Sequence, residues 1–308
     1  MRWRCPGVYV TIAWEGEPVS LPLRDLLPSQ HRELYVRVIA RALAVAVLLA
    51  LVGLLARQLD VGPGIVPLVD PDWRSFWLAG LVLTIATGMA FQVADRTPAH
   101  ALETAIQRRV RYASASELPT AWILPAVTTL AAVMFLGVYH SGIAIAGCAL
   151  GAFLLLTAGA ITRHHLFDAD ADARERARGI ATILVHVIAF VALSMIYINK
   201  VRSLFSATAV LVIGVLLLLV LTEGEDVLFG RRLVYALAGG LLLGEVTWAL
   251  NYWKATGWIG GAVLLVFFYV VAGLISAHGR GGVSRRDLAE YGGVGALAFG
   301  IIVYSLFR

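Results

Sequence analysis

Nine apolar runs of membrane-spanning length, separated by short charged connectors, occupy nearly all of this chain after residue 35. A helix of about 20 apolar residues crosses the roughly 30 Å hydrocarbon core of a bilayer. In that core only α-helices and closed barrels satisfy every backbone N–H and C=O group, and these runs lack the alternation of barrel strands. The pattern therefore predicts an all-α, polytopic bundle of transmembrane helices.

The predicted chain has two parts. Residues 1–35 form an N-terminal segment, in which two β-like runs around a Gly16 turn predict a small hairpin. Residues 36–308 form the transmembrane domain, whose mean hydropathy raises the value for the whole chain to +0.81. We expect its helices near 36–56, 73–93, 120–139, 141–161, 180–198, 204–222, 233–253, 257–276 and 291–307.

The positions of the cationic residues predict the orientation. If residue 1 lies in the cytoplasm, 19 of the 25 Lys and Arg residues fall in cytoplasmic segments, and such a bias is typical of membrane proteins. We therefore expect an N-in, C-out, multi-pass protein in contact with the lipid bilayer. The same bias explains the basic pI, so we expect no nucleic-acid partner. Arg outnumbers Lys 23 to 2, which is typical of a GC-rich bacterial genome and favours the bacterial inner (plasma) membrane.

Glu245 is the one acidic residue inside a predicted span. An ionised carboxylate in the hydrocarbon core costs about 2.5–3.5 kcal/mol or more, so such residues generally face a cavity or a partner. Trp248 and Tyr252 follow at helical spacing on the same face. We expect the three residues to line a ligand-binding or proton-coupling pocket within the bundle, while an interhelical hydrogen bond is the structural alternative.

His186 and Tyr197 form a second candidate site. His186 is the one histidine well inside a predicted span, and Thr182 and Tyr197 fall on its side of the same helix. The stripe is a candidate proton relay. A neutral histidine bonded to a backbone carbonyl is the alternative interpretation.

Asp168, Asp170 and Asp172 form the most metal-like cluster, in a predicted cytoplasmic connector. Hard cations prefer several carboxylates in a flexible loop. No glycine turn or terminal glutamate completes a calcium loop, however, and arginines follow at once. A solvated charge run at the start of a helix explains the pattern better, so no metal site is predicted and no cofactor is identified.

Small residues at four-residue spacing predict close helix packing. The pattern occurs at Gly147 and Gly151, at Gly240 and Gly244, and at Gly257 and Gly261.

The C-terminal third carries Gly244-Glu-x-x-Trp248, then Tyr269, Gly273 and Glu290-Tyr291. Over about residues 200–308 the chain therefore resembles an uncharacterised bacterial family of multi-pass membrane proteins. No activity is attached to that family, so the resemblance implies a helical membrane fold and no particular function.

Three functions follow as hypotheses. The first is transporter-like handling of a small or lipidic ligand within the bundle. The second is a metal-dependent transferase acting on a lipid or isoprenoid at the cytoplasmic face; its candidate residues are Asp168, Asp170, Asp172, Glu223, Glu225 and Asp226. The third is a non-catalytic assembly subunit that docks a membrane-protein partner. The sequence does not decide whether the protein is an enzyme.

Overall fold

The fold was analysed in a computed structural model of the chain. The structure describes residues 9–14, 17–22, 28–61, 73–95, 120–166, 171–199, 203–223, 229–252, 257–279 and 282–306.

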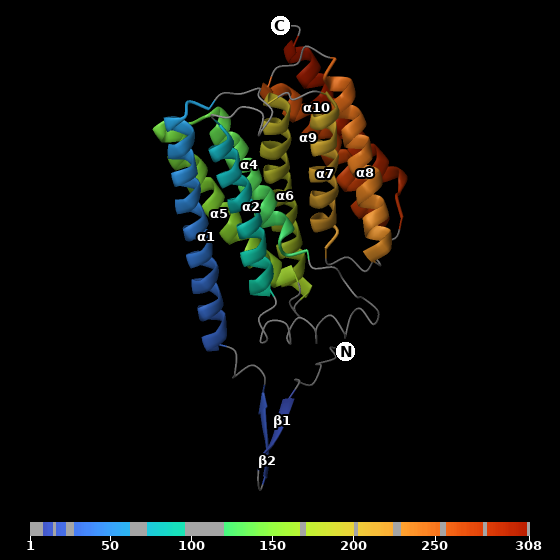
Figure 1. Cartoon of the computed structure of the whole chain (residues 1–308). Coiled ribbons are helices and arrows are strands. Elements are labelled where there is room, and N and C mark those ends of the chain that lie inside the picture. The colour runs from blue at the N-terminus through green and yellow to red at the C-terminus, as the bar shows by residue number, and fades with distance from the viewer. Residues whose placement is uncertain are drawn as a thin grey trace.

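Nine α-helices in this described part run alternately in opposite directions along one bundle (Figure 1). They are α1 (Pro28–Gln58), α2 (Arg74–Asp95), α4 (Ile123–Val138), α5 (Gly142–Leu166), α6 (Ala171–Ile198), α7 (Ser203–Leu221), α8 (Phe229–Leu250), α9 (Gly257–Gly279) and α10 (Arg285–Leu306). Eight of them are long and apolar enough to cross a membrane, and α4 is shorter. Each predicted span coincides with one of these helices, which confirms the helical membrane fold.

A two-stranded antiparallel hairpin precedes the bundle. Strand β1 (Tyr9–Trp14) pairs with β2 (Glu17–Pro22), and Trp14 lies opposite Glu17 across the turn. The strands fall where the sequence predicts a hairpin. We call the end of the bundle at which α1 begins the proximal end, and the end at which α1 stops the distal end.

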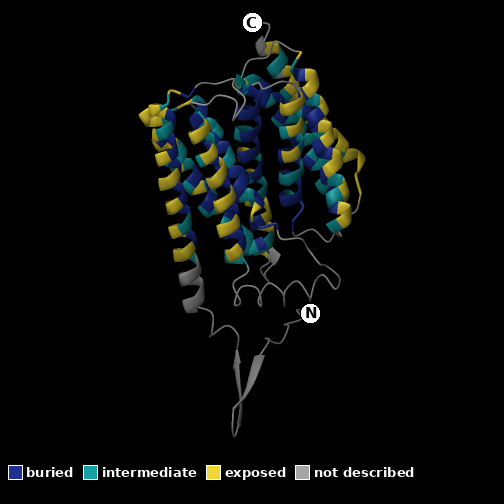
Figure 2. Cartoon of the chain, viewed as in Figure 1, coloured by how far each residue is buried: buried dark blue, intermediate teal, exposed yellow. Residues whose placement is uncertain are grey.

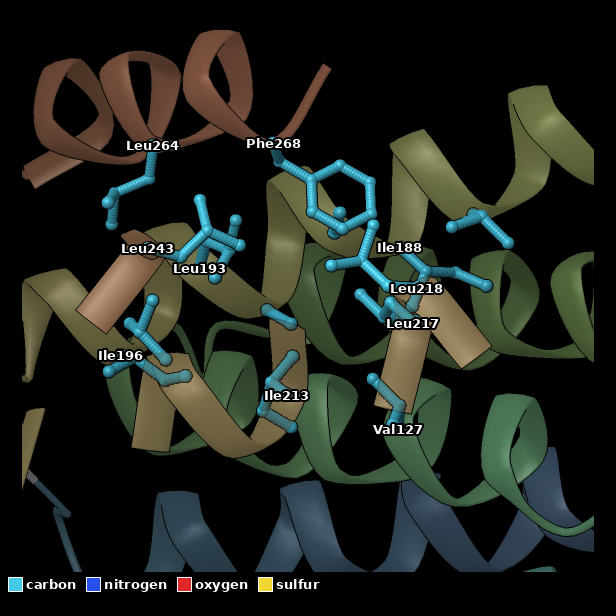
Figure 3. Close-up of a cluster of buried hydrophobic side chains, with 14 of the residues drawn as sticks. Val127, Ile188, Leu193, Ile196, Ile213, Leu217, Leu218, Leu243, Leu264 and Phe268 are labelled. Carbon is cyan, nitrogen blue, oxygen red and sulfur yellow. The ribbon is translucent and has the colours of Figure 1, made fainter. Parts of the chain in front are cut away.

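The helices pack around two hydrophobic clusters that define two groups. The first group is α1, α2 and α5, whose side chains surround Leu49, Leu136 and Leu156. The second group is α6 to α9, with Leu193, Leu217 and further residues at its centre (Figure 3). Helix α4 contributes side chains to both clusters, so it lies between the two groups.

The outer surface of the bundle is apolar. Exposed residues follow the outward faces of the helices (Figure 2), and they include Ile143, which is 90% exposed, and Leu204, which is 74% exposed. Removing such a side chain from water stabilises it by about 1.5–3 kcal/mol, so these exposed faces are suited to lipid. The arrangement is that of a multi-pass membrane protein.

Glycines allow two helix pairs to approach closely. A Cβ on Gly240 would lie 2.8 Å from the Leu211 carbonyl oxygen of α7, and one on Gly261 would lie 1.9 Å from Ser194 Oγ of α6. These two motifs pack helices as predicted. The prediction for Gly147 and Gly151 is wrong, because a Cβ at either position meets nothing within 4 Å among the described residues.

Candidate functional site

Four polar residues from distant parts of the chain meet at the proximal end. Asp95 is the last residue of α2, Thr120 precedes α4, Arg163 lies in the last turn of α5, and Glu223 follows α7. We call these four residues the ionic cluster. The cluster lies at the end of the bundle where α2, α5 and α7 end and α4 begins. This arrangement brings segments separated by up to 103 positions in the sequence into contact.

Arg163 lies between two carboxylates. Its guanidinium donates hydrogen bonds to Glu223 and to both oxygens of Asp95, the latter at 3.5 Å. Thr120 Oγ1 donates to the other Glu223 oxygen at 2.7 Å. The Glu223 side chain is 1% exposed, whereas those of Arg163 and Asp95 are 17% and 21% exposed. A buried carboxylate is stable only when paired and hydrogen-bonded in this way.

A second buried arginine lies in the same region. Arg232 of α8 is 2% exposed; its Nε donates to Thr222 Oγ1 at 3.3 Å and its Nη2 donates to the Leu219 carbonyl at 2.9 Å. On the other side of the cluster, the Trp122 backbone N–H donates to Gln92 Oε1 at 3.3 Å. Among the described residues of this region, the two arginines match the two carboxylates of the ionic cluster in number.

The ionic cluster joins the two helix groups. Asp95 and Arg163 belong to the first group, Glu223 follows a helix of the second, and Thr120 leads into the shared helix α4. At the proximal end, buried ionic contacts among the described residues therefore connect the two groups.

A pocket of about 880 Å³ opens at the distal end. It lies between the end of α1, the α4–α5 connection and the start of α9, and so between the same two groups. The lining residues are Arg57, Asp60, Phe135, Val138, Tyr139, His140, Ser141, Gly142, Ala144 and Trp258. A volume of this size is in the range of small-molecule sites.

Hydrogen bonds and ring contacts fix the walls of this pocket. The Trp258 indole N–H donates to the Tyr139 hydroxyl at 3.0 Å, and the two rings stack with centroids 6.3 Å apart. His140 Nε2 lies 3.6 Å from an Asp60 carboxylate oxygen. Asp60 has a φ of 48°, a left-handed conformation that few non-glycine residues adopt and that clusters at functional sites.

His186 lies in the second group, half-buried between α6 and α9. Its Nδ1 is 2.7 Å from the Thr182 carbonyl, as the structural alternative predicts. Its ring packs edge-on against Phe268 and Tyr269, with centroids 5.3 and 5.9 Å away. Its Nε2 is buried and has no hydrogen-bond partner within the described part of the chain. Tyr197 is fully buried and donates to the Leu250 carbonyl at 3.1 Å, which ties α6 to the end of α8.

Glu245, Trp248 and Tyr252 share one face of the chain, as predicted, but that face is the outer surface of α8. All three are exposed, Trp248 by 56% and Tyr252 by 74%, and the two rings contact each other with centroids 5.5 Å apart. The expected location within the bundle is therefore corrected: Gly240 and Gly244 turn the opposite face of α8 toward α7. A role for Glu245 in binding or proton coupling stays a prediction.

The acidic connectors lie largely outside the described residues, including Asp168, Asp170, Glu225 and Asp226. Asp172 is exposed in the first turn of α6, and its carbonyl accepts a hydrogen bond from Arg176 Nε at 3.2 Å. No group of three or more metal-ligating side chains occurs among the residues that the structure describes.

Sequence reasoning missed the ionic cluster and the distal pocket as sites. It placed Arg163 and Arg232 in cytoplasmic segments just outside the predicted spans 141–161 and 233–253, whereas both belong to helices, α5 and α8, and both side chains are largely buried. The available signal was an arginine within one turn of an apolar run. For the pocket, the signal was the polar and aromatic sequence Tyr139-His140-Ser141 in a very short connection.

The alternating apolar helices and their apolar outer faces define a multi-pass integral membrane protein. The family described as "Protein of unknown function (DUF5656)" matches residues 60–305, which is most of the chain, and the chain belongs to this family. The match confirms the expected likeness to an uncharacterised family and extends it beyond the C-terminal third. No curated protein and no solved structure matches the chain.

Proposed function

We propose that this protein carries a small or lipidic ligand across the membrane by alternating access between its two helix groups. One observation supports this most directly. The ionic cluster joins the two groups at the proximal end, and a pocket lies between residues of both groups at the distal end. Carriers of this kind rock one helix group against the other around a ligand site.

The energetics suit a two-state element. Breaking a buried ion pair costs about 3–5 kcal/mol when one partner is lost, so the ionic cluster favours the state that is closed at the proximal end. A ligand shifts such an equilibrium only through its different affinity for the two states. The distal pocket is formed by both groups, and its ligand contacts therefore change when the groups move.

The remaining predicted residues take subsidiary roles in this proposal. His186, with its buried Nε2, is the candidate for a proton relay in the second group. Glu245 faces outward and would act on lipid or on another membrane protein. In the proposed orientation the N-terminus is cytoplasmic, the distal pocket opens to the outside, and the protein lies in the bacterial inner membrane.

A second candidate function is assembly with another membrane protein. The specific observation in its favour is the outward position of Glu245 beside exposed Trp248 and Tyr252. A carboxylate on a lipid-facing surface is expensive to maintain, and a partner helix with a hydrogen-bond donor would satisfy it. Blue-native electrophoresis of wild type and Glu245→Leu separates the two functions. A larger wild-type complex that is lost in the variant supports assembly, whereas an unchanged size does not.

Cysteine accessibility tests the carrier proposal without a known ligand. In a background with Cys5 and Cys148 replaced by alanine, Ser141→Cys reports on the distal pocket and buried Thr162→Cys reports on the proximal end. Adding Glu223→Gln breaks the ion pair. We expect alkylation of position 162 to rise at least several-fold and that of position 141 to fall.

Asp172→Cys, exposed at the proximal end, serves as the control that should not change. Equal rises at positions 141 and 162 would indicate general loosening and would contradict alternating access. Unchanged rates in a folded variant would contradict it as well.

A further inference from the structure

We propose that the distal pocket binds an anionic amphiphile, with its oxyanion headgroup at Arg57 and the first turn of α5 and its apolar part against Phe135 and Trp258. This inference gives the ligand class of the carrier proposed above. It rests on that proposed function only in taking the bound ligand to be the one that is transported. The shared chemistry is a phosphate-type headgroup on an apolar group, whether it comes from a bilayer lipid or from a soluble amphiphile.

Three side chains of the pocket wall can donate hydrogen bonds to a ligand. Arg57 presents N–H donors and no acceptor. Tyr139 already accepts the Trp258 N–H, so its own hydroxyl proton remains available for a ligand oxygen. Ser141 Oγ accepts the Ala144 N–H at 3.3 Å, and its proton is available in the same way. Among the lining residues the one carboxylate is Asp60; its side chain is 98% exposed and lies next to His140.

Two positive features converge on one point of the wall. The 25-residue helix α5 begins at Gly142 in the pocket wall, where Ser141 already accepts the N–H groups of Ala144 and Ile145 and those of Gly142 and Ile143 precede them. Such a terminus carries partial positive charge and binds anions. A Cβ on Gly142 would lie 3.9 Å from Arg57 Nη1, so the guanidinium lies beside the first residue of this helix. The cation and the helix terminus therefore act on the same ligand atoms.

The opposite side of the pocket is aromatic. Phe135 packs on Tyr139 with centroids 5.0 Å apart, and Trp258 contacts Tyr139 on one side and Phe190 on the other, the latter at 5.6 Å. Flat apolar rings beside a cationic point suit a molecule with an anionic head and an apolar body. The pocket also opens at the distal end of helices whose outer faces are apolar, where amphiphiles concentrate.

Binding in neutral phosphatidylcholine nanodiscs tests the proposal. The probes are octyl phosphate, inorganic phosphate and octyltrimethylammonium, together with discs that contain phosphatidylglycerol; the readouts are the shift in Tm and native mass spectrometry. We expect octyl phosphate to raise Tm and the cationic probe to have no effect. Arg57→Gln should weaken octyl phosphate binding about tenfold or more, because it removes a charge-assisted contact.

Arg74→Gln is the matched control, since it removes the same charge at the same end of the bundle but outside the pocket. Trp258→Ala should weaken octyl phosphate without affecting inorganic phosphate. Retention of phosphatidylglycerol by wild type but not by Arg57→Gln identifies a bilayer lipid as the source, and binding of added octyl phosphate alone identifies a soluble one. Equal binding by wild type and Arg57→Gln, or equal binding of the cationic probe, would overturn the inference.

The two proposals fail separately. Anion binding without the opposite alkylation changes at positions 141 and 162 would leave the pocket assignment standing and reject the carrier. The alkylation changes without anion binding would leave the carrier standing and reject this ligand class.

Discussion

Glu223 is the residue on which the proximal end depends. Its side chain is 1% exposed and has Arg163 on one oxygen and Thr120 on the other. A buried carboxylate loses its hydration, and attraction to a cation compensates for that loss only when the geometry is kept. Removal of either partner therefore leaves a buried group without its compensation.

Glu223→Ala should lower the free energy of unfolding by about 3–5 kcal/mol, because the buried Arg163 guanidinium then loses its buried acidic partner and keeps only the longer contacts to Asp95. The measurement is denaturant unfolding in detergent micelles. Asp172→Ala, at an exposed acidic position, should change stability by less than about 1 kcal/mol. Equal small losses in both variants would show that the ionic cluster contributes little.

His186→Phe should leave the free energy of unfolding within about 1 kcal/mol of wild type. The variant removes the buried Nε2 that has no partner among the described residues, while an aromatic ring still packs against Phe268 and Tyr269. The variant also removes the Nδ1 contact to the Thr182 carbonyl, but that carbonyl still accepts the backbone N–H four residues on within α6, so the loss stays small. A loss above about 2 kcal/mol on thermal unfolding would contradict this account of the histidine.

Residue-scale contacts were the hardest to predict from the sequence. The acidic residue at position 223 entered the transferase hypothesis as a metal ligand, because local sequence shows charge and hides its partner. Its partner Arg163 lies 60 positions away. Only the packing of α5 beside the connection after α7 brings the two together, and no spacing rule reports such a contact.

At the scale of elements, helices α7 and α8 pack closely because a glycine at their interface has no side chain. A Cβ on Gly240 would lie 2.4 Å from Val215 Cγ2 and 2.8 Å from the Leu211 carbonyl oxygen, and the backbone oxygen cannot move away freely. The contact is dominated by van der Waals packing, as expected between helices in lipid.

Gly240→Ala should destabilise the protein by about 1–3 kcal/mol, because overpacking forces the helices apart. Gly147→Ala is the matched control on α5, where a Cβ meets no described atom within 4 Å. It should lie within about 1 kcal/mol of wild type, since alanine is the better helix former. Thermal unfolding in nanodiscs compares the two. Similar stabilities would contradict the close α7–α8 contact.

Element positions were predictable because hydropathy reports length and apolarity directly. All nine runs became helices, whereas the direction in which the Glu245 face of α8 points was predicted wrongly. Glu245 shows why: in a helix with apolar residues on all sides, the sequence does not distinguish the lipid-facing side from the packed side. Gly240 and Gly244 decide the question by packing on α7, which leaves Glu245 outside.

At the scale of the whole molecule, the described part of the bundle has the ionic cluster at one end and a pocket at the other. The charge bias predicts which side of the membrane each end faces. In the cysteine-free background, Ser141→Cys should react with a membrane-impermeant maleimide added to intact cells, because it lies at the distal end. Asp172→Cys, exposed at the proximal end, should react only after lysis. The reverse pattern would contradict the N-in, C-out orientation.

The central position of α4, between two groups of helices of which one is translated later, has a consequence for biosynthesis. It has 16 residues, about 24 Å of helix at 1.5 Å per residue, which is shorter than the roughly 30 Å core of a bilayer. Its side chains complete both hydrophobic clusters, yet α6 to α9 are translated after it. While the ribosome is still producing those helices, one side of α4 has no protein neighbour in the bilayer. A nascent chain released after α5 would therefore expose a core surface to lipid, and the order of translation becomes part of how this protein reaches its fold.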